Sequence, residues 1–341
     1  MKLSTKTNDN PTFLICRLSS LGDVALTTAI TRQISNAYPN SKIYFVTGEN
    51  FTEIYRFHPH VRGVFSYKRD FTPWQLKLFK KEILQTANVK RFDYFIDLQN
   101  NRRSRELREN LAVNTYEYDK NRLFKLCLVL TKRALKKRQR HVVELYRTAL
   151  SKLNVPGEDD GLELYGERGR IVRQQSGPGR KIVICPGAKH FTKSYPPEKY
   201  AKAIDMLAEE GYEVTINAAE FESEAVKSIT DKTRSTPTVR LTNSILEMAQ
   251  LFSECDVAVT NDSAAAHIAA ACKLPSVVVY GSTVPEFGFT PYKAPYEAVI
   301  NKVECQPCTH IGRDKCPLKH FNCMNGIDPS EILIKVRLLN K

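Results

Sequence analysis

A short loop near the start of the chain carries a carboxylate that could act on a hydroxyl group. The loop is Ser19-Ser20-Leu21-Gly22-Asp23, between an apolar stretch at 13–17 and a helical stretch at 24–36. A carboxylate placed there could accept a proton from an attacking hydroxyl as a general base. Asp23 could instead only cap the helix, because negative charge stabilises a helix N-terminus. The residues alone leave both roles open.

Two later segments have the residue types that bind phosphate. The loop 185–197 contains Thr192, Lys193 and Ser194, and offers hydroxyl groups, backbone amides and an ammonium group. The segment 260–267 opens a helix with small residues, so that a diphosphate could approach its free N–H groups. In the alternative interpretation, Asp262 and Ser263 only cap this helix and His267 lies in the core.

Four of the nine cysteines fall close together near the C-terminus, at Cys305, Cys308, Cys316 and Cys323. The spacing of the first pair is typical of metal ligands, but the later gaps match neither common pattern. We therefore expect no metal and no cofactor. The other five are expected to be small core residues: Cys16, Cys127, Cys185, Cys255 and Cys272.

The elements that position these loops alternate between strands and helices. In the first half, strands are expected at 13–17, 42–47 and 92–98, with helices at 24–36 and 73–88. In the second half, strands are expected at 181–185, 213–217, near Val239, 257–260 and 276–280, with helices between them. Such alternation predicts an α/β fold with two doubly wound parallel sheets, which bind ligands at the carboxyl ends of their strands.

Glycine and proline are concentrated between residues 154 and 180, which indicates a linker. We place the domain boundary near residue 175, giving domains 1–175 and 176–341. The last helix, expected at 329–339, could cross back to the N-terminal domain.

The net charge of +14 is unevenly distributed. Residues 1–175 contain 32 Lys and Arg against 18 Asp and Glu, whereas the remainder contains 19 of each. The first half should therefore face an anionic partner, although a solvated basic surface is an equal alternative for part of it. The basic region lacks interleaved aromatic residues and a nucleic-acid motif, so we expect no nucleic acid as partner.

No stretch approaches the roughly 20 apolar residues that cross a bilayer, and the first ten residues are polar. We expect a cytoplasmic protein, peripheral to the inner membrane at most.

Three motifs together resemble the signature regions of the ADP-heptose:lipopolysaccharide heptosyltransferases, glycosyltransferase family 9. They are the segment 17–24, the Pro-Gly to Tyr-Pro-Pro segment 186–197, and Asn261-Asp262-Ser263 with His267. The resemblance extends over nearly the whole chain. It implies a GT-B architecture, with two Rossmann-like domains facing across a cleft. It also implies that the first domain binds the acceptor, the second binds the nucleotide-sugar, and transfer needs no metal.

The resemblance also implies roles for individual residues. Asp23 is the expected general base, and Lys193 is expected near the donor phosphates and the leaving group. The other expected donor-binding residues are Thr192, Glu220 (with Glu222 as a neighbour), Asp262, Ser263, Ala264 and His267. The expected acceptor-binding residues are Ser20, Gly22, Arg102 and Arg103. Two positions depart from the family pattern, because Ala264 stands where glycine is usual and Tyr195 where tryptophan is common.

The function implied is inverting transfer of heptose from ADP-heptose to the phosphorylated inner core of lipopolysaccharide, the anionic glycolipid built on lipid A. One alternative is transfer of another nucleotide-sugar to a protein or surface glycan. The other is a non-catalytic protein that binds a nucleotide-sugar or nucleic acid.

Overall fold

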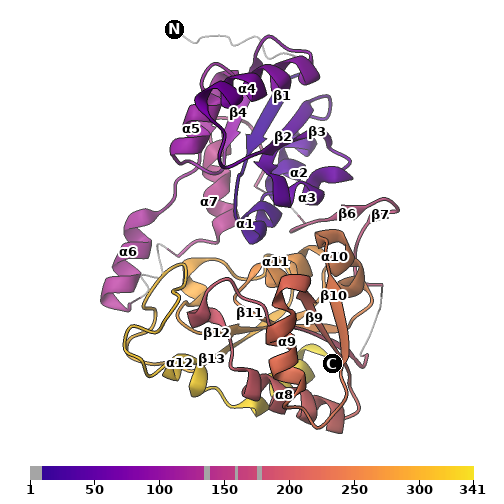
Figure 1. Cartoon of the computed structure of the whole chain (residues 1–341). Coiled ribbons are helices and arrows are strands. Elements are labelled where there is room, and N and C mark those ends of the chain that lie inside the picture. Colours follow the sequence, from indigo (N-terminus) through magenta and orange to yellow (C-terminus); the bar gives the residue numbers. More distant parts are fainter. Residues whose placement is uncertain (1–9, 134–138, 158–159, 175–178) are drawn as a thin grey trace. The chain divides into compact units, whose positions relative to one another are not determined.

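The computed structural model describes residues 10–133, 139–157, 160–174 and 179–341 (Figure 1). The expected domain boundary at 175/176 and the polar segment 1–9 lie outside these residues. The chain forms two compact units. The first contains Met1–Lys120, Val143–Asp160 and Tyr165–Gly169, and the second contains Asn121–Val142, Gly161–Leu164 and Arg170–Lys341.

Within the described residues, the first unit is built on a five-stranded parallel sheet with the order β3-β2-β1-β4-β5. Its strands are β1 (Thr12–Cys16), β2 (Lys42–Gly48), β3 (Val61–Tyr67), β4 (Phe92–Asp97) and β5 (Ala112–Glu117). Its helices are α1 (Leu21–Leu26), α2 (Thr28–Ala37), α3 (Glu53–Arg56), α4 (Pro73–Ala87), α5 (Arg102–Arg108) and α7 (Val142–Arg147), with 3-10 helices η1 (Glu49–Phe51) and η3 (Thr148–Leu150). The central strand β1 is buried along its whole length, which explains its unbroken apolar run.

The helix expected at 24–36 is two helices, α1 and α2, that meet at Thr27. The Thr27 hydroxyl donates to the carbonyl oxygen of Val24 at 2.6 Å, and the Thr28 hydroxyl donates to that of Ala25 at 2.8 Å. Hydroxyl groups that hydrogen-bond to the preceding turn compete with the helical pattern and bend helices. The break leaves α1 as a short helix that carries Asp23.

In the part of the second unit that the structure describes, the strands form a six-stranded parallel sheet with the order β10-β9-β8-β11-β12-β13. Its strands are β8 (Lys181–Cys185), β9 (Glu213–Ala219), β10 (Thr238–Thr242), β11 (Val257–Asn261), β12 (Ser276–Tyr280) and β13 (Tyr296–Ile300). Its helices are α6 (Arg122–Thr131), α8 (Pro197–Glu209), α9 (Ser223–Thr230), α10 (Ile245–Ser253), α11 (Ala264–Ala271), α12 (Asn322–Asn325) and α13 (Pro329–Leu339), with 3-10 helices η4 (Phe191–Lys193), η5 (Glu220–Glu222) and η6 (Pro285–Phe287). A two-stranded ribbon joins β6 (Tyr165–Gly166) to β7 (Gly169–Arg170).

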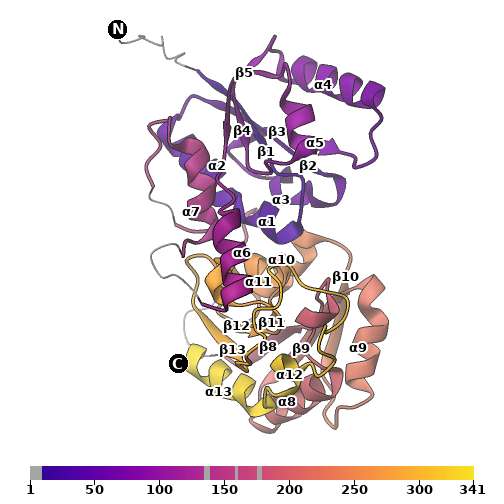
Figure 2. The same ribbon diagram turned by 90° about the vertical axis from the view of Figure 1, so that its left-hand side faces the viewer.

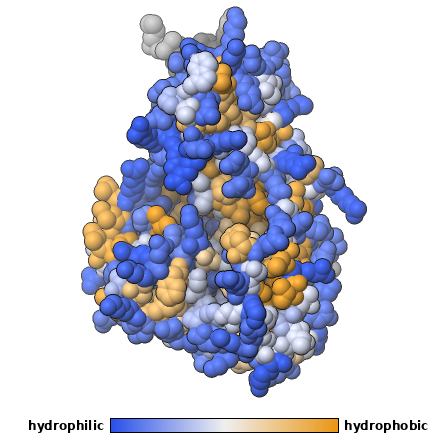
Figure 3. All heavy atoms as spheres, in the orientation of Figure 1, coloured by the Kyte–Doolittle hydropathy of each residue, from blue (hydrophilic) through white to orange (hydrophobic). Residues whose placement is uncertain are grey.

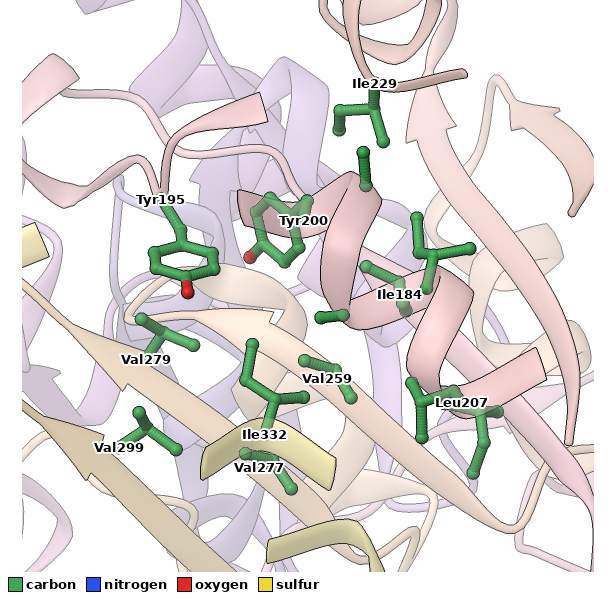
Figure 4. Close-up of a cluster of buried hydrophobic side chains, with 14 of the residues drawn as sticks. Ile184, Tyr195, Tyr200, Leu207, Ile229, Val259, Val277, Val279, Val299 and Ile332 are labelled. Carbon is green, nitrogen blue, oxygen red and sulfur yellow. The ribbon is translucent and has the colours of Figure 1, made fainter. Parts of the chain in front are cut away.

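One face of the second sheet is covered by α8 and α13, as Figure 2 also shows. Valines of β11 and β12 pack against Leu207 of α8 and Ile332 of α13 (Figure 4). The last helix, α13, which was expected to be able to cross back to the N-terminal domain, belongs to the second unit. Its apolar side chains are part of this core, because Ile332 and Val336 are fully buried in it.

The division of the chain differs from the expected single boundary, because residues 121–142 belong to the second unit. Helix α6 packs there through Phe124 and Leu128, which form a small apolar cluster with Phe287. Cys127 of this helix is exposed, contrary to the expectation that it is a core residue. Within the described part of the chain, no helix is long and apolar enough to cross a membrane.

Candidate functional site

Except for Glu220, which follows β9, the candidate residues come after two neighbouring strands in the middle of each sheet. The order of the first sheet reverses between β1 and β4, and that of the second reverses between β8 and β11. Chains that leave two such neighbouring strands turn to opposite faces, which opens a crevice at their carboxyl ends. The loop after β1 carries Asp23, and the loop after β11 carries Asp262.

Asp23 lies in a network that we call the Asp23 cluster, made of Asp23, Arg17, Ser20 and Tyr146. Arg17 forms an ion pair with Oδ1 of Asp23 at 2.7 Å. Tyr146 of α7 donates a longer hydrogen bond, 3.3 Å, to the same oxygen. Oδ2 accepts the backbone N–H of Ser20 at 3.1 Å and its hydroxyl at 2.7 Å. Asp23 therefore caps α1, in a capping box with Ser20.

These contacts fix the charge of Asp23. Burial raises its pKa, but the Arg17 guanidinium and the hydrogen bonds from Ser20 outweigh burial and hold the pKa below its ordinary value. The carboxyl group is therefore ionised at neutral pH. Its side chain is 18% exposed, so a bound hydroxyl could reach it. Because a carboxylate has about four lone-pair directions, such a hydroxyl must replace one of the four donors.

Arg17 was not singled out from the sequence, yet it is the buried centre of this cluster. Its NH1 group donates to the carbonyl oxygen of Leu98 at 2.6 Å and to the Tyr118 hydroxyl at 3.3 Å. Its guanidinium also lies 5.5 Å from the centre of the Tyr146 ring. The available signal for Arg17 was a basic residue at the end of the apolar run 13–17, directly before the loop that carries a carboxylate. No local signal marked Tyr146, because it comes from a helix more than a hundred residues away.

The loops after β1 and β4 are joined by Gln99, whose Oε1 accepts the backbone N–H groups of Leu18 and Ser19. The β4 loop leads into α5, which carries the two arginines expected to bind the acceptor. Arg102 is 91% exposed and pairs with Glu106 one turn on. Arg103 is half-buried and near Tyr67. Of the expected loop residues, Ser20 is exposed and Gly22 is buried.

In the second unit, Lys193 forms an ion pair with Oδ2 of Asp262 at 2.7 Å. Thr283 donates to the same oxygen at 2.6 Å, and we call these three residues the Lys193 cluster. The Lys193 side chain is 16% exposed and that of Asp262 is 11% exposed. The contact brings two of the three sequence motifs together, since 69 residues separate these positions in the sequence.

Asn261 connects the 186–195 loop to the end of β11. Its Oδ1 accepts the backbone N–H of Tyr195 at 3.2 Å and the Tyr200 hydroxyl at 3.0 Å, and its Nδ2 donates to the carbonyl oxygen of Pro186 at 2.6 Å. Tyr195 is buried, and its hydroxyl donates to the carbonyl oxygen of Ile327. The aromatic residue at 195 therefore supports the loop from within the core.

Thr192 is a buried residue of this loop and is 1% exposed. Its hydroxyl oxygen accepts the Ser282 hydroxyl at 2.9 Å and the backbone N–H of Arg313 at 2.8 Å. These contacts tie the loop to the segment after β12 and to the cysteine-bearing tail. They describe a supporting residue rather than one that faces a ligand.

Helix α11 presents its N-terminus beside Asp262. Ser263 is its N-cap but makes no side-chain capping hydrogen bond. The residues at 263–265 are partly exposed, so their N–H groups can reach a ligand, whereas His267 is 5% exposed and buried within the helix packing. Ala264 is the first residue of a regular helix, where alanine is favourable and the conformational freedom of glycine is not needed.

Glu220 lines a pocket of about 440 Å³ at the carboxyl ends of β9 and β10. The pocket is lined by Ala219, Glu220, Phe221, Thr242 and Asn243. Phe221 is 88% exposed and was not predicted. Glu222 instead accepts the backbone N–H of Ala219 at 3.0 Å and caps η5. A free carboxylate beside an exposed aromatic ring suits a ribose next to a flat base.

The profile of glycosyltransferase family 9 (heptosyltransferase) matches residues 81–319 of this chain. This match covers more than half of the 341 residues. The chain belongs to glycosyltransferase family 9.

Relatives of the chain within family 9 include two Campylobacter proteins. It is 26% identical over 170 residues to lipooligosaccharide heptosyltransferase 2 of Campylobacter jejuni, covering 48% of this chain and 52% of that protein. It therefore spans about half the length of that relative. It is 23% identical to lipopolysaccharide heptosyltransferase 1 of Campylobacter coli, covering 95% of this chain and 98% of that protein.

The fold is also that of a solved family 9 structure. The structure of E. coli ADP-heptose lps heptosyltransferase II superposes with a TM-score of 0.68 at 18% identity, over 96% of this chain and 98% of that one. This likeness confirms the predicted fold class, the GT-B type with two Rossmann-like domains.

The cysteines of the tail come near one another in this family 9 chain. Burial and the three neighbouring cysteines raise the pKa of Cys323 to about 12. The Sγ atom of Cys305 lies 3.7 Å from Nε2 of His320. Within the described ranges, no three His, Cys, Asp or Glu residues are arranged to hold a metal ion. The expectation that transfer needs no metal stays a prediction.

Proposed function

We propose that this protein is an inverting heptosyltransferase that moves heptose from ADP-heptose to the phosphorylated inner core of lipopolysaccharide. The observation that carries the proposal is Asp23, an ionised and partly exposed carboxylate held at the reversal point of the first sheet. The printed names of the relatives, lipopolysaccharide heptosyltransferase 1 and ADP-heptose lps heptosyltransferase II, support the choice of sugar and acceptor.

In the proposed reaction, the acceptor oxygen attacks the anomeric carbon of the heptose while its proton passes to Asp23. The bond between that carbon and the β-phosphate oxygen breaks, and ADP leaves with the electron pair. Attack opposite the leaving group inverts the anomeric configuration. Ser20 is exposed, so we propose that the acceptor hydroxyl replaces the hydrogen bond of the Ser20 hydroxyl to Oδ2.

Donor binding is assigned to the second unit. Lys193 and the N–H groups at 263–265 supply positive charge for the departing diphosphate, in the role that a metal ion fills in other transferases. Asp262 holds the ammonium group of Lys193 in place. Glu220 would accept hydrogen bonds from the ribose hydroxyls, and the ring of Phe221 would contact the base.

Acceptor binding is assigned to the first unit, through Arg103, Arg102 and the loop with Ser20 and Gly22. The positive excess within residues 1–175 supports an anionic acceptor, and eight of its Lys and Arg residues lie in 121–142, which belong to the second unit. We propose a cytoplasmic protein that meets its glycolipid at the inner leaflet of the membrane, with no role for nucleic acid.

The test is a panel of ADP- and GDP-sugars with a phosphorylated heptose-free core acceptor, followed by NMR of the new glycosidic linkage. The proposal expects transfer from ADP-heptose with inverted configuration, unchanged by EDTA. Transfer only from another nucleotide-sugar, or a product with retained configuration, would overturn it. Salt-sensitive binding to duplex DNA without any ADP-sugar affinity would favour the nucleic-acid alternative.

A further inference from the structure

Helix α6 exposes an apolar face to solvent. Leu123 is 72% exposed, Leu126 56% and Leu130 70%, and Cys127 between them is also exposed. These positions recur at helical spacing and form one stripe about 10 Å long, at 1.5 Å per residue. Figure 3 shows apolar side chains gathered at the left edge of the view, where α6 lies in Figure 1.

The opposite face of α6 is already occupied. Phe124 and Leu128 are buried against Phe287, with Val129 and Phe289 partly buried around them. The helix is thus held in place by one apolar face while the other remains outside. Because the helix is already formed, its exposed apolar face can bind a partner without the entropy cost of folding a disordered segment.

Basic residues lie at both ends of this exposed stripe. Between Lys120 and Arg140 the sequence contains nine Lys and Arg residues and no Asp or Glu. Arg122, Lys132 and Arg133 are exposed at the two ends of the helix.

We infer that α6 is a membrane-surface anchor, whose exposed leucines enter the boundary between the headgroups and acyl chains of an anionic bilayer. Apolar side chains on one side of a helix with a concentration of positive charge fit such a surface. A second copy of this chain fits less well, because two copies of a segment with nine like charges would repel. The biological reason for membrane binding rests on the proposed function, because the proposed acceptor is a glycolipid. The binding test itself does not need that acceptor.

The test measures binding of the purified full chain to vesicles by flotation. The main variant is Leu123→Ser/Leu126→Ser/Leu130→Ser, whose replaced side chains are exposed and do not hold the fold together. A matched control is Val113→Ser/Leu318→Ser, which removes apolar side chains that are 70% and 61% exposed elsewhere. A third variant, Arg122→Gln/Arg133→Gln, removes charge and leaves the leucines in place.

The wild-type chain should bind vesicles containing phosphatidylglycerol and should not bind pure phosphatidylcholine. The leucine variant should bind the anionic vesicles at least about tenfold more weakly, while the control stays within about twofold of wild type. The arginine variant should also bind less, with the loss greatest at low salt.

Equal vesicle binding by the leucine variant and wild type would overturn the inference. It would also be overturned if the leucine variant lost only self-association, measured by light scattering, because α6 would then join two copies.

A transfer assay separates the inference from the proposed function. The leucine variant should lose rate on an acceptor in vesicles and keep it on a delipidated one. If wild type transfers to neither, the proposed function fails while the vesicle result still decides the role of α6.

Discussion

In the proposed reaction, one carboxylate, that of Asp23, would serve both as a helix cap and as a base. As a cap it has to be ionised and fixed, and the contacts with Ser20, Arg17 and Tyr146 achieve both. As a base it has to accept a proton although its pKa is held low, which makes it a weak base in the resting cluster. The two roles are compatible if the proton passes late in the attack, because the bond forming between the acceptor oxygen and the anomeric carbon makes the hydroxyl proton more acidic.

Replacing the carboxylate separates these roles. We expect Asp23→Asn to lower kcat/KM by roughly 10²–10⁴ while the Kd for ADP changes little. Gln75→Ala is the matched control, since Gln75 completes the capping box of α4 away from the cluster. Steady-state kinetics and thermal unfolding would be measured on both. Wild-type transfer rates in a folded Asp23→Asn protein would show that Asp23 is only a cap.

The pH profile tests Arg17 as a positioning residue. With the Asp23 pKa below its ordinary value of about 4, the acid limb of kcat/KM should lie below pH 4. Arg17→Met removes the cation that lowers the pKa of Asp23 and leaves Asp23 buried, so the acid limb should move to higher pH. Arg17→Lys keeps a cation and should return the limb part of the way to its wild-type position. A purely structural Arg17 would lower the rate without moving the limb.

The same shift fixes the sign of a stability effect. A carboxyl group whose pKa is lower in the folded protein stabilises it above the unfolded pKa, and that contribution is lost as the pH falls. The free energy of unfolding should therefore fall more steeply below about pH 4 in wild type than in Asp23→Asn.

At the scale of elements, prediction succeeded where burial is greatest. The central strands β1, β8, β11 and β12 are buried along nearly their whole length, and their apolar runs were sufficient to find them. The strands β3, β5 and β13 were not predicted. All three lie at the edges of their sheets, where polar and exposed residues interrupt the pattern, as in the sequence of β5. Edge position is a property of the folded sheet and cannot be obtained from a short segment.

The end of β2 supports the loop that carries Asp23. A side chain at Gly48 would place its Cβ 2.7 Å from the carbonyl oxygen of Leu18, which is backbone and cannot yield easily. We expect Gly48→Ala to destabilise the protein by about 1–3 kcal/mol and to lower kcat by displacing the loop. In Gly157→Ala the new Cβ would meet no atom within 4 Å, so this variant should behave as wild type. Denaturant unfolding and kinetics would check both, and equal behaviour would show that the loop tolerates the shift.

The first turn of α11 tests the departure from the family pattern. Ala264→Gly should lower the KM for the ADP-sugar if the methyl group crowds the diphosphate, at a stability cost of up to about 1 kcal/mol. Ala265→Gly is the control, because it makes the same backbone change one residue later in the partly exposed first turn. A decrease in KM with both variants would point to helix flexibility rather than to the methyl group.

At the scale of the whole molecule, the charge division gives a prediction about salt. If residues 1–175 attract a phosphorylated acceptor, kcat/KM for it should fall several-fold between about 50 and 300 mM salt. The same enzyme acting on a dephosphorylated acceptor should show a weaker dependence. Identical salt dependence for both acceptors would mean that the basic residues do not attract the phosphate groups of the acceptor.

The fold class and the placement of the motifs on loops were predictable from the chain, because parallel sheets bring distant strand ends to one edge. The partners of the candidate residues were not. That Lys193 pairs with Asp262, and that Tyr146 reaches Asp23, depends on loop conformations and on packing between segments far apart in the sequence. The domain division was incomplete for the same reason, since residues 121–142 follow β5 in sequence but pack against Phe287.

The packing of residues 121–142 in the second unit affects how hybrid proteins could be made from the N-terminal and C-terminal halves of two relatives. A hybrid cut at residue 175 would separate Phe124 and Leu128 from Phe287 unless both parents matched there. A fragment that ended at 175 would carry α6 with both of its apolar faces uncovered, and it should aggregate. Grafting the N-terminal half of one family member onto another should therefore succeed only when the recipient keeps its own α6.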